Sequence, residues 1–213
     1  MQRALLLIDI QYDFCPGGHL PVPDGDAVVP VANRLAQKID LVVATKDWHP
    51  ANHGSFAANH PWRKPGQVIQ LDGLDQILWP IHCVQGSFGA EFHHDLDTAP
   101  IAKVFYKGTD PDIDSYSGFF DNGHRKSTGL GDYLKEKRVA QLYIVGLATD
   151  YCVKFTVLDA LELGFETYVV REGVRGIDQQ AGDVERALQE MQAKGAHLVS
   201  ESEVPESARA NEG

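Results

Sequence analysis

Cysteine is scarce in this sequence. Its 213 residues include only Cys15, Cys83 and Cys152, an odd number that is too small for a disulfide framework. At least one thiol therefore stays free, and this cysteine usage favours a reducing compartment such as the cytoplasm.

Long apolar runs are missing as well. The first apolar run, LLLI, is interrupted by Asp9 and leads to no small-residue cleavage site of a signal peptide. No stretch approaches the roughly 20 apolar residues that a transmembrane helix needs. We therefore expect a cytoplasmic protein without a membrane partner.

Positive charge is also in short supply. The 19 Lys and Arg residues face 30 Asp and Glu residues, which gives a net charge of −11. Nucleic-acid binding begins with a basic face, so no nucleic-acid partner is expected. A chain of this length can form one domain that buries roughly 70% of its unfolded surface. We assign residues 1–204 to that domain and residues 205–213 to a C-terminal tail.

Short apolar runs alternate with amphipathic helical patterns. Several runs are nearly continuous in Val, Ile, Leu and Tyr, as expected for parallel strands that helices cover on both faces. The alternation predicts an α/β sandwich with right-handed crossovers. The predicted strands are residues 4–10, 41–45, 102–106, 142–147, 167–170 and 197–199.

Three segments carry apolar residues at helical spacing, and in the first and last of them these residues fall at i, i+3, i+4 and i+7. They are residues 28–35, about 151–163, and 184–191. Asp24 or Asp26 is available as an N-cap for the first helix. Gly164 and Gly195 stand where the other two helices would end.

Residues 48–100 interrupt this alternation. The segment is rich in Pro, Gly, Asn and His and has little periodicity. Long irregular segments within compact domains are usually functional or disordered. Its Trp and His residues suit packing and ligation, so we expect it to bind a metal or a substrate.

Reactive side chains follow four of the predicted strands. Asp9, Asp47, Lys107 and Cys152 each stand at or soon after a strand end. Each alone has an ordinary explanation as a cap, a solvated charge or a small buried thiol. Ligands of open α/β sheets, however, bind beyond the carboxyl ends of the strands. Four such residues at one edge therefore indicate a catalytic centre, with Cys152 at a helix N-terminus that favours its thiolate.

Histidines near Asp47 suggest a metal site. Asp47 and His49 are two residues apart, and His82 follows much later in the chain. Two imidazoles and a carboxylate form a metal-binding face with open positions. His53 and His60 lie in the same loop and could supply a further ligand or a supporting hydrogen bond. A pair of Asp and His alone is a weak signal, because such pairs are common on surfaces.

Five sequence blocks resemble the nicotinamidases, also called pyrazinamidases, of the isochorismatase-like cysteine hydrolase superfamily. The blocks are ALLLIDIQYDFCPGG, VVATKDWHPANHGSFA, WPIHCVQGSFGAEFH, VFYKGTDPDIDSYSGFFDN and GLATDYCVKFTVLDALELG, in that order. The resemblance covers nearly the whole chain. It implies a six-stranded parallel sheet with helices on both faces, a Rossmann-like three-layer sandwich, and a cis peptide at Leu147–Ala148.

The resemblance also implies a role for each candidate residue. Cys152 would be the nucleophile, Asp9 the proton shuttle and Lys107 the third catalytic residue, with the backbone amides of Ala148 and Cys152 as the oxyanion hole. The metal ligands would be Asp47, His49 and His82, around one divalent ion. Zinc is favoured, and iron or manganese also suits such a set. His53 matches a position that some family members use as a fourth ligand. The substrate-binding side chains would be Phe14, Trp79 and Tyr116.

The activity implied by the resemblance is hydrolysis of nicotinamide to nicotinate and ammonia through a cysteine thioester, in NAD salvage. Pyrazinamide would react in the same way. Two other enzyme activities stay open: a ureido or N-carbamoyl amidase, whose relatives generally lack the metal residues, and an isochorismatase, which needs no nucleophilic thiol. A metal-binding protein without catalytic activity is the alternative from another class. It would require one of the three catalytic residues to be absent, and Cys152, Asp9 and Lys107 are all present. The resemblance leaves a homo-oligomer open.

Overall fold

The computed structural model describes residues 2–206, and residues 1 and 207–213 lie outside that range. The tail expected at 205–213 is therefore described only at its start, where the Arg3 guanidinium donates to the carbonyl oxygens of Pro205 and Glu206. The boundary at residue 204 stays a prediction. Among residues 2–206, no helix is long and apolar enough to cross a membrane.

Six strands form one parallel sheet, as the sequence predicts. Their order is β5-β2-β1-β6-β7-β8, so the chain starts near the middle of the sheet and builds outward in both directions. This order places the carboxyl ends of β1, β2, β5 and β6 side by side. The strands are β1 (Gln2–Ile8), β2 (Leu41–Asp47), β5 (Ile101–Lys107), β6 (Val139–Leu147), β7 (Glu166–Arg175) and β8 (His197–Val199).

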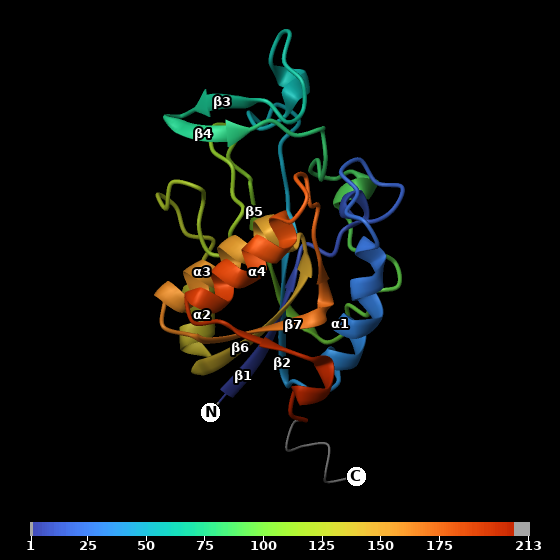
Figure 1. Ribbon diagram of the computed structural model, residues 1–213, viewed down its shortest axis with the longest axis vertical. Helices are drawn as coiled ribbons and strands as arrows, with labels where there is room; N and C mark the ends of the chain where they lie inside the picture. Colours follow the sequence, from blue (N-terminus) through green and yellow to red (C-terminus); the bar gives the residue numbers. More distant parts are fainter. Residues whose placement is uncertain (1, 207–213) are drawn as a thin grey trace.

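Helices cover both faces of the sheet (Figure 1). Helix α1 (Val28–Ala36) packs on one face, and α2 (Leu130–Glu136), α3 (Lys154–Glu162) and α4 (Asp183–Ala193) pack on the other. Successive side chains of a strand point to opposite faces. Leu5 and Leu7 of β1 accordingly join the core beside α1, whereas Leu6 joins the core beside α2 and α3. The near-continuous apolar strands thus supply two cores.

The helices differ from the sequence expectations in three respects: one N-cap, one starting residue and one additional helix. Helix α1 follows a 3-10 turn, and its N-cap is Ala27, so neither Asp24 nor Asp26 caps it. Helix α3 begins at Lys154 because residues 149–153 form a π-helical turn. The seven-residue helix α2 was not predicted, because a helix this short holds too few apolar residues for a helical spacing to be recognised. The expected stops at Gly164 and Gly195 are present, with φ of 87° and 112°.

The segment 48–100 is mostly irregular but contains an antiparallel hairpin of β3 (Val68–Leu71) and β4 (Leu74–Ile77). Asp72 and Gly73 join these strands with φ of 47° and 80°, as a tight hairpin turn requires. Figure 1 shows the hairpin beyond the end of the sheet that carries the site. The Asp-Gly pair was the sequence signal for this missed element.

Candidate active site

Three charged side chains meet at the carboxyl ends of the neighbouring strands β1, β2 and β5. Asp47 ends β2 and Lys107 ends β5, and the two are paired in register across the sheet. Asp9 directly follows β1, with φ of 47°. The Thr45 hydroxyl donates to Asp9 Oδ1 at 2.7 Å and receives the Asp9 backbone N–H at 3.3 Å. The strand geometry therefore brings together residues that lie almost 100 positions apart.

Lys107 connects these groups. Its side chain is fully buried, and Nζ donates to Asp47 Oδ1 at 2.6 Å, the Ser115 carbonyl at 2.9 Å and Cys152 Sγ at 3.3 Å. Nζ also lies 2.9 Å from Asp9 Oδ2, an oxygen that receives no hydrogen bond within the part of the chain that the structure describes. An ammonium group has three protons, and all three are already engaged. Asp9 Oδ2 is therefore free to accept a proton.

The thiol of Cys152 reaches this cluster from the turn after β6. One oxygen of Asp9, one of Asp47 and the sulfur of Cys152 all lie within 4.8 Å of one another. The expected cis peptide at Leu147–Ala148 precedes the turn. Gly146 has φ of 126°, and a Cβ there would lie 2.1 Å from the Ile8 carbonyl oxygen. Only glycine allows β1 and β6 to approach this closely where Asp9 and the Cys152 turn leave the sheet.

Burial sets the resting charges of the cluster. It raises the pKa of the Cys152 thiol well above its usual value, although Lys107 opposes this shift. The thiolate expected at a helix N-terminus is therefore disfavoured at rest. Burial also raises the pKa of Asp9. Burial lowers the pKa of Lys107, but the carboxylates of Asp47 and Asp9 outweigh it and hold that pKa well above its ordinary value. The centre thus contains a protonated thiol beside a fixed positive charge.

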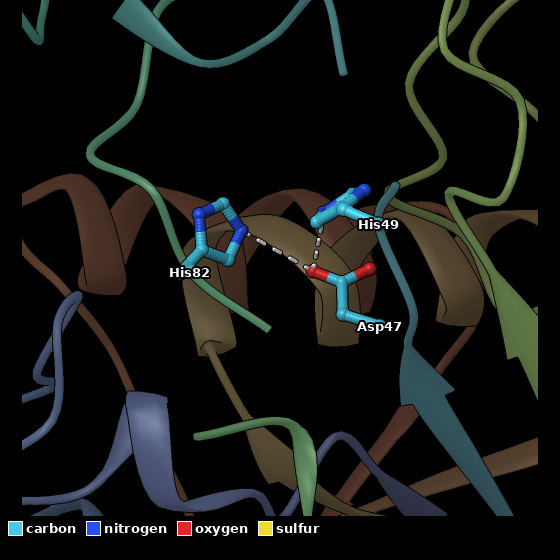
Figure 2. A group of neighbouring side chains, drawn as sticks. All are labelled: Asp47, His49 and His82. Atoms are coloured by element: carbon cyan, nitrogen blue, oxygen red, sulfur yellow. Dashed lines mark ion pairs between the residues drawn. The ribbon is translucent and has the colours of Figure 1, made fainter. Parts of the chain in front are cut away.

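A second group of ligands adjoins this cluster. Asp47 Oδ2 lies 3.3 Å from His49 Nε2 and 3.5 Å from His82 Nε2, and Figure 2 shows both rings directed at the carboxylate. Ligand atoms bound at 2.0–2.2 Å in a tetrahedral site are about 3.3–3.5 Å apart. The spacing of these three atoms therefore fits a divalent metal ion.

Hydrogen bonds on the far side of each imidazole support this interpretation. His49 Nδ1 is 2.8 Å from the Gly108 carbonyl, and His82 Nδ1 is 2.8 Å from the Pro80 carbonyl. Donation from Nδ1 leaves Nε2 as the lone-pair nitrogen, which is how protein ligands of metals are usually oriented. His49 Nε2 is buried and receives no hydrogen bond from any described residue. A buried acceptor of this kind fits a cation.

His53 lies beside the ligand set. Its ring centre is 4.2 Å from that of His49, and its Nδ1 is 2.7 Å from the Ser55 hydroxyl. Burial lowers the pKa of His53 to about 4, so the ring is neutral near pH 7. His60 instead points Nε2 at the Gly54 carbonyl at 2.7 Å. Of the two loop histidines, His53 is therefore the one that lies beside the predicted metal ligands.

An aromatic pocket leads to the thiol. It is lined by Phe14, Trp79 and Tyr116, the three residues predicted to hold a substrate, together with Asp47, His82 and Cys152. The Tyr116 hydroxyl accepts a hydrogen bond from Trp79 Nε1 at 3.2 Å, which joins two of the walls. The lining of this aromatic pocket thus includes the thiol and two of the predicted metal ligands, Asp47 and His82.

Sequence reasoning missed several residues that shape the site. The Gln11 side chain accepts from the Asp47 backbone N–H at 2.9 Å and donates to the Asp47 carbonyl at 2.8 Å, so it holds the end of β2. Tyr151 lines the pocket, and its ring is 4.9 Å from that of Trp79. Gln11 and Tyr151 stand within the recognised sequence blocks, two residues from Asp9 and one from Cys152. That proximity was the available signal.

A parallel α/β sheet that carries a thiol, a carboxylate and an ammonium at its carboxyl edge is typical of a hydrolase with a cysteine nucleophile. The isochorismatase domain matches residues 3–203, and the chain belongs to the isochorismatase family, within its nicotinamidase and pyrazinamidase group. It is 54% identical to the nicotinamidase of Escherichia coli over 93% of this chain and 94% of that protein.

Solved structures agree with this assignment. The nicotinamidase of Acinetobacter baumanii superposes with a TM-score of 0.91 at 46% identity, covering 94% of this chain and 97% of that one. The pyrazinamidase of Pyrococcus horikoshii, solved in complex with zinc, gives a TM-score of 0.76 at 41% identity, covering 94% and 99%. The similarity extends over whole chains.

Proposed function

We propose that this protein is a nicotinamide amidohydrolase, which converts nicotinamide to nicotinate and ammonia and serves NAD salvage. The observation that carries the proposal is the buried cluster of Cys152, Lys107 and Asp9 at the base of an aromatic pocket. Nicotinamidases are the relatives with high identity over the whole chain. Pyrazinamide carries the same carboxamide on a similar ring, so we propose that it reacts as well. The cytoplasmic location and a homo-oligomer stay predictions.

The pocket would hold the pyridine ring against Phe14 and Trp79, with Tyr116 closing one side. Such a fit directs the carboxamide carbon at Cys152 Sγ, because the thiol lines the same cavity. Holding both reacting groups in place supplies much of the rate enhancement that enzymes obtain from proximity.

Asp9 would act as the proton carrier. It accepts the Cys152 proton as the sulfur attacks the carboxamide carbon, since its Oδ2 receives no hydrogen bond from the residues described. The fixed charge of Lys107, 3.3 Å from Sγ, stabilises the sulfur as it becomes negative. The backbone amides of Ala148 and Cys152 would hold the oxyanion, at about 3–4 kcal/mol for a good donor.

Breakdown of the tetrahedral intermediate releases ammonia. Protonated Asp9 returns its proton to the leaving nitrogen, and the carbon–nitrogen bond breaks to leave a thioester on Cys152. Asp9 then removes a proton from an incoming water molecule, whose oxygen attacks the thioester carbon. The carbon–sulfur bond breaks, Asp9 returns the proton taken from water to the sulfur, and the nicotinic acid formed loses its carboxyl proton to solvent or to ammonia and leaves as nicotinate. Lys107 stays protonated throughout, as its raised pKa requires.

Asp47, His49 and His82 would hold one divalent ion, and we propose zinc. When bound, the ion supplies a positive charge that fixes the ring nitrogen and orients the substrate in the pocket. Asp47 has a second task, because its other oxygen is 2.6 Å from Lys107 Nζ. We propose that His53, which lies beside His49, makes an additional contact with this ion.

The test is ammonia release from nicotinamide by zinc-loaded protein. Cys152→Ala should lose at least about 10⁴-fold in kcat, because Asp9 and Lys107 cannot take over the role of the nucleophile. Cys15→Ala is the matched control, since Cys15 is buried in the core beside α1 and does not line the pocket. Its activity should remain. Nicotinate must form in equal amount to ammonia.

Folded, zinc-loaded wild-type protein that releases no ammonia from nicotinamide would contradict the proposal. N-carbamoyl substrates would then be assayed with the same variants, because they need the same three catalytic groups.

A further inference from the structure

A second set of metal-ligand side chains lies away from the proposed active centre. His124, Asp159 and Glu162 each offer one ligand atom, and these atoms lie within 4.8 Å of one another. Asp159 and Glu162 are three residues apart on α3, so they project from the same face of that helix. His124 comes from the loop that follows Tyr116. None of the three contributes to the pocket beside Cys152.

The spacing of His124 and Asp159 fits a metal ion. His124 Nε2 lies 3.2 Å from Asp159 Oδ1. The corresponding separations among Asp47, His49 and His82 are 3.3 and 3.5 Å. All three values are close to the roughly 3.3 Å between neighbouring ligands of a tetrahedral zinc ion. The separation between His124 and Asp159 thus matches the two separations printed for the first set.

Asp159 has an unsatisfied oxygen. Its side chain is 7% exposed, and Oδ2 has no hydrogen-bond partner among residues 2–206. A buried carboxylate oxygen without a partner is unfavourable, and a cation removes that cost. This oxygen is the second, independent observation that points to a cation ligand.

The loop holds His124 in place. Asp121 Oδ1 accepts the backbone N–H groups of Gly123 and Arg125, which fixes the residues on either side. The His124 ring stacks on Phe120, with ring centres 5.0 Å apart. Little conformational entropy would therefore be lost when the imidazole binds an ion.

This loop is joined to the pocket. The Asn122 side-chain oxygen accepts the Tyr116 backbone N–H at 2.9 Å, and the Asn122 N–H donates to the Asp114 carbonyl at 2.8 Å. Helix α3 begins two residues after Cys152. An ion shared by His124 and α3 would therefore fasten the segment that carries Tyr116 to the helix that follows the nucleophile.

We propose that His124, Asp159 and Glu162 form a second divalent-cation site of the zinc class, separate from Asp47, His49 and His82. Its role is to clamp the loop 121–126 to α3. One imidazole and two carboxylates suit zinc better than calcium or magnesium, which prefer oxygen ligands alone.

A competing cluster is less suitable. His93, His94 and Asp95 are also close together, but the side chains of His94 and Asp95 are 65% and 68% exposed. No oxygen or nitrogen of this cluster is buried without a partner in the described part of the chain. It serves as the matched comparison in the test.

The experiment measures zinc stoichiometry by equilibrium dialysis of the full chain after removal of metal with a chelator. Wild type should bind two zinc ions, and His124→Asn and Glu162→Gln should each bind the second at least tenfold more weakly. His94→Asn should keep both. The second equivalent should also raise the melting temperature of wild type but not of His124→Asn. The His124 side chain is half exposed, so this variant should fold.

A single zinc ion in wild type, or a second zinc that survives His124→Asn and disappears in His94→Asn, overturns the proposal. Ammonia release from nicotinamide is measured separately on the same proteins. The nicotinamidase proposal can therefore stand or fall independently of this second site.

Discussion

Two buried lysines on neighbouring strands have different surroundings. Lys46 of β2 has a side chain that is 6% exposed, and its Nζ lies 2.8 Å from Glu91, which is 52% exposed. The same Nζ lies 4.5 Å above the ring of Phe92. Lys107 of β5 is completely buried, and its charged partners are the buried Asp9 and Asp47.

The difference between them is the way each charge is compensated. Lys46 places its ammonium group over aromatic rings and has a partner that water also solvates, which is an ordinary structural arrangement. Lys107 is held by buried groups that include a thiol and an unsatisfied carboxylate oxygen. Burial alone therefore does not identify a catalytic lysine. The chemistry of its neighbours does.

Replacing each lysine by methionine tests this comparison with the largest expected effect. Lys107→Met should lower kcat/KM for nicotinamide by at least about 10³-fold, because it removes the charge that faces the attacking sulfur. Lys46→Met should leave kcat/KM within about threefold and cost about 1–2 kcal/mol of unfolding free energy. Steady-state kinetics and urea unfolding measure the two effects.

Lys107→Met also leaves two buried carboxylates unpaired, which costs about 3–5 kcal/mol. Activity must therefore be expressed per folded molecule, with circular dichroism as the control. Equal losses of kcat/KM in both variants would contradict the assignment of a catalytic role to Lys107 and a structural role to Lys46.

The metal site gives a smaller and separable effect. Asp47 touches both Lys107 and the histidines, so changing it would disturb two functions at once. His82→Ala removes a proposed ligand that makes no contact with Lys107. Zinc affinity should fall more than about 100-fold, because even groups that merely orient ligands contribute about 10- to 100-fold. Metal analysis after dialysis measures it.

His60→Ala is the matched control for that experiment. His60 lies in the same irregular segment, but its Nε2 faces the Gly54 carbonyl. Its zinc content should equal that of wild type. Retention of zinc by His82→Ala would contradict the ligand assignment.

The sequence predicts the sheet and the four strand ends well, because continuous apolar runs locate parallel strands and the sheet aligns their ends. It could not predict contacts between distant segments. Nothing local to Gln11 shows that it holds Asp47. Apart from the family resemblance, the residues around the two lysines do not reveal that Lys107 is paired with buried carboxylates whereas Lys46 is paired with an exposed one. The charge state of Cys152 was also beyond sequence reasoning, since its depth of burial depends on the whole fold.

The pH dependence of the reaction gives the smallest expected effect. Asp9 must be ionised to accept the thiol proton, and burial raises its pKa despite the opposing charge of Lys107. Activity should therefore be present above that pKa and fall as pH decreases through it, with the acid limb of kcat/KM above the ordinary range of an aspartate side chain. Thr45→Val removes the hydroxyl that donates to Asp9 Oδ1 at 2.7 Å.

Loss of that hydrogen bond should move the acid limb upward by about 0.5–1 pH unit, since a hydrogen bond contributes about 0.5–1.5 kcal/mol and one unit corresponds to about 1.4 kcal/mol. Lys46→Met should not move it, because Lys46 does not contact Asp9. An acid limb that stays in place in Thr45→Val, or moves equally in Lys46→Met, would show that a group other than Asp9 controls the proton transfer. The contrast between the two lysines would then apply to charge stabilisation alone.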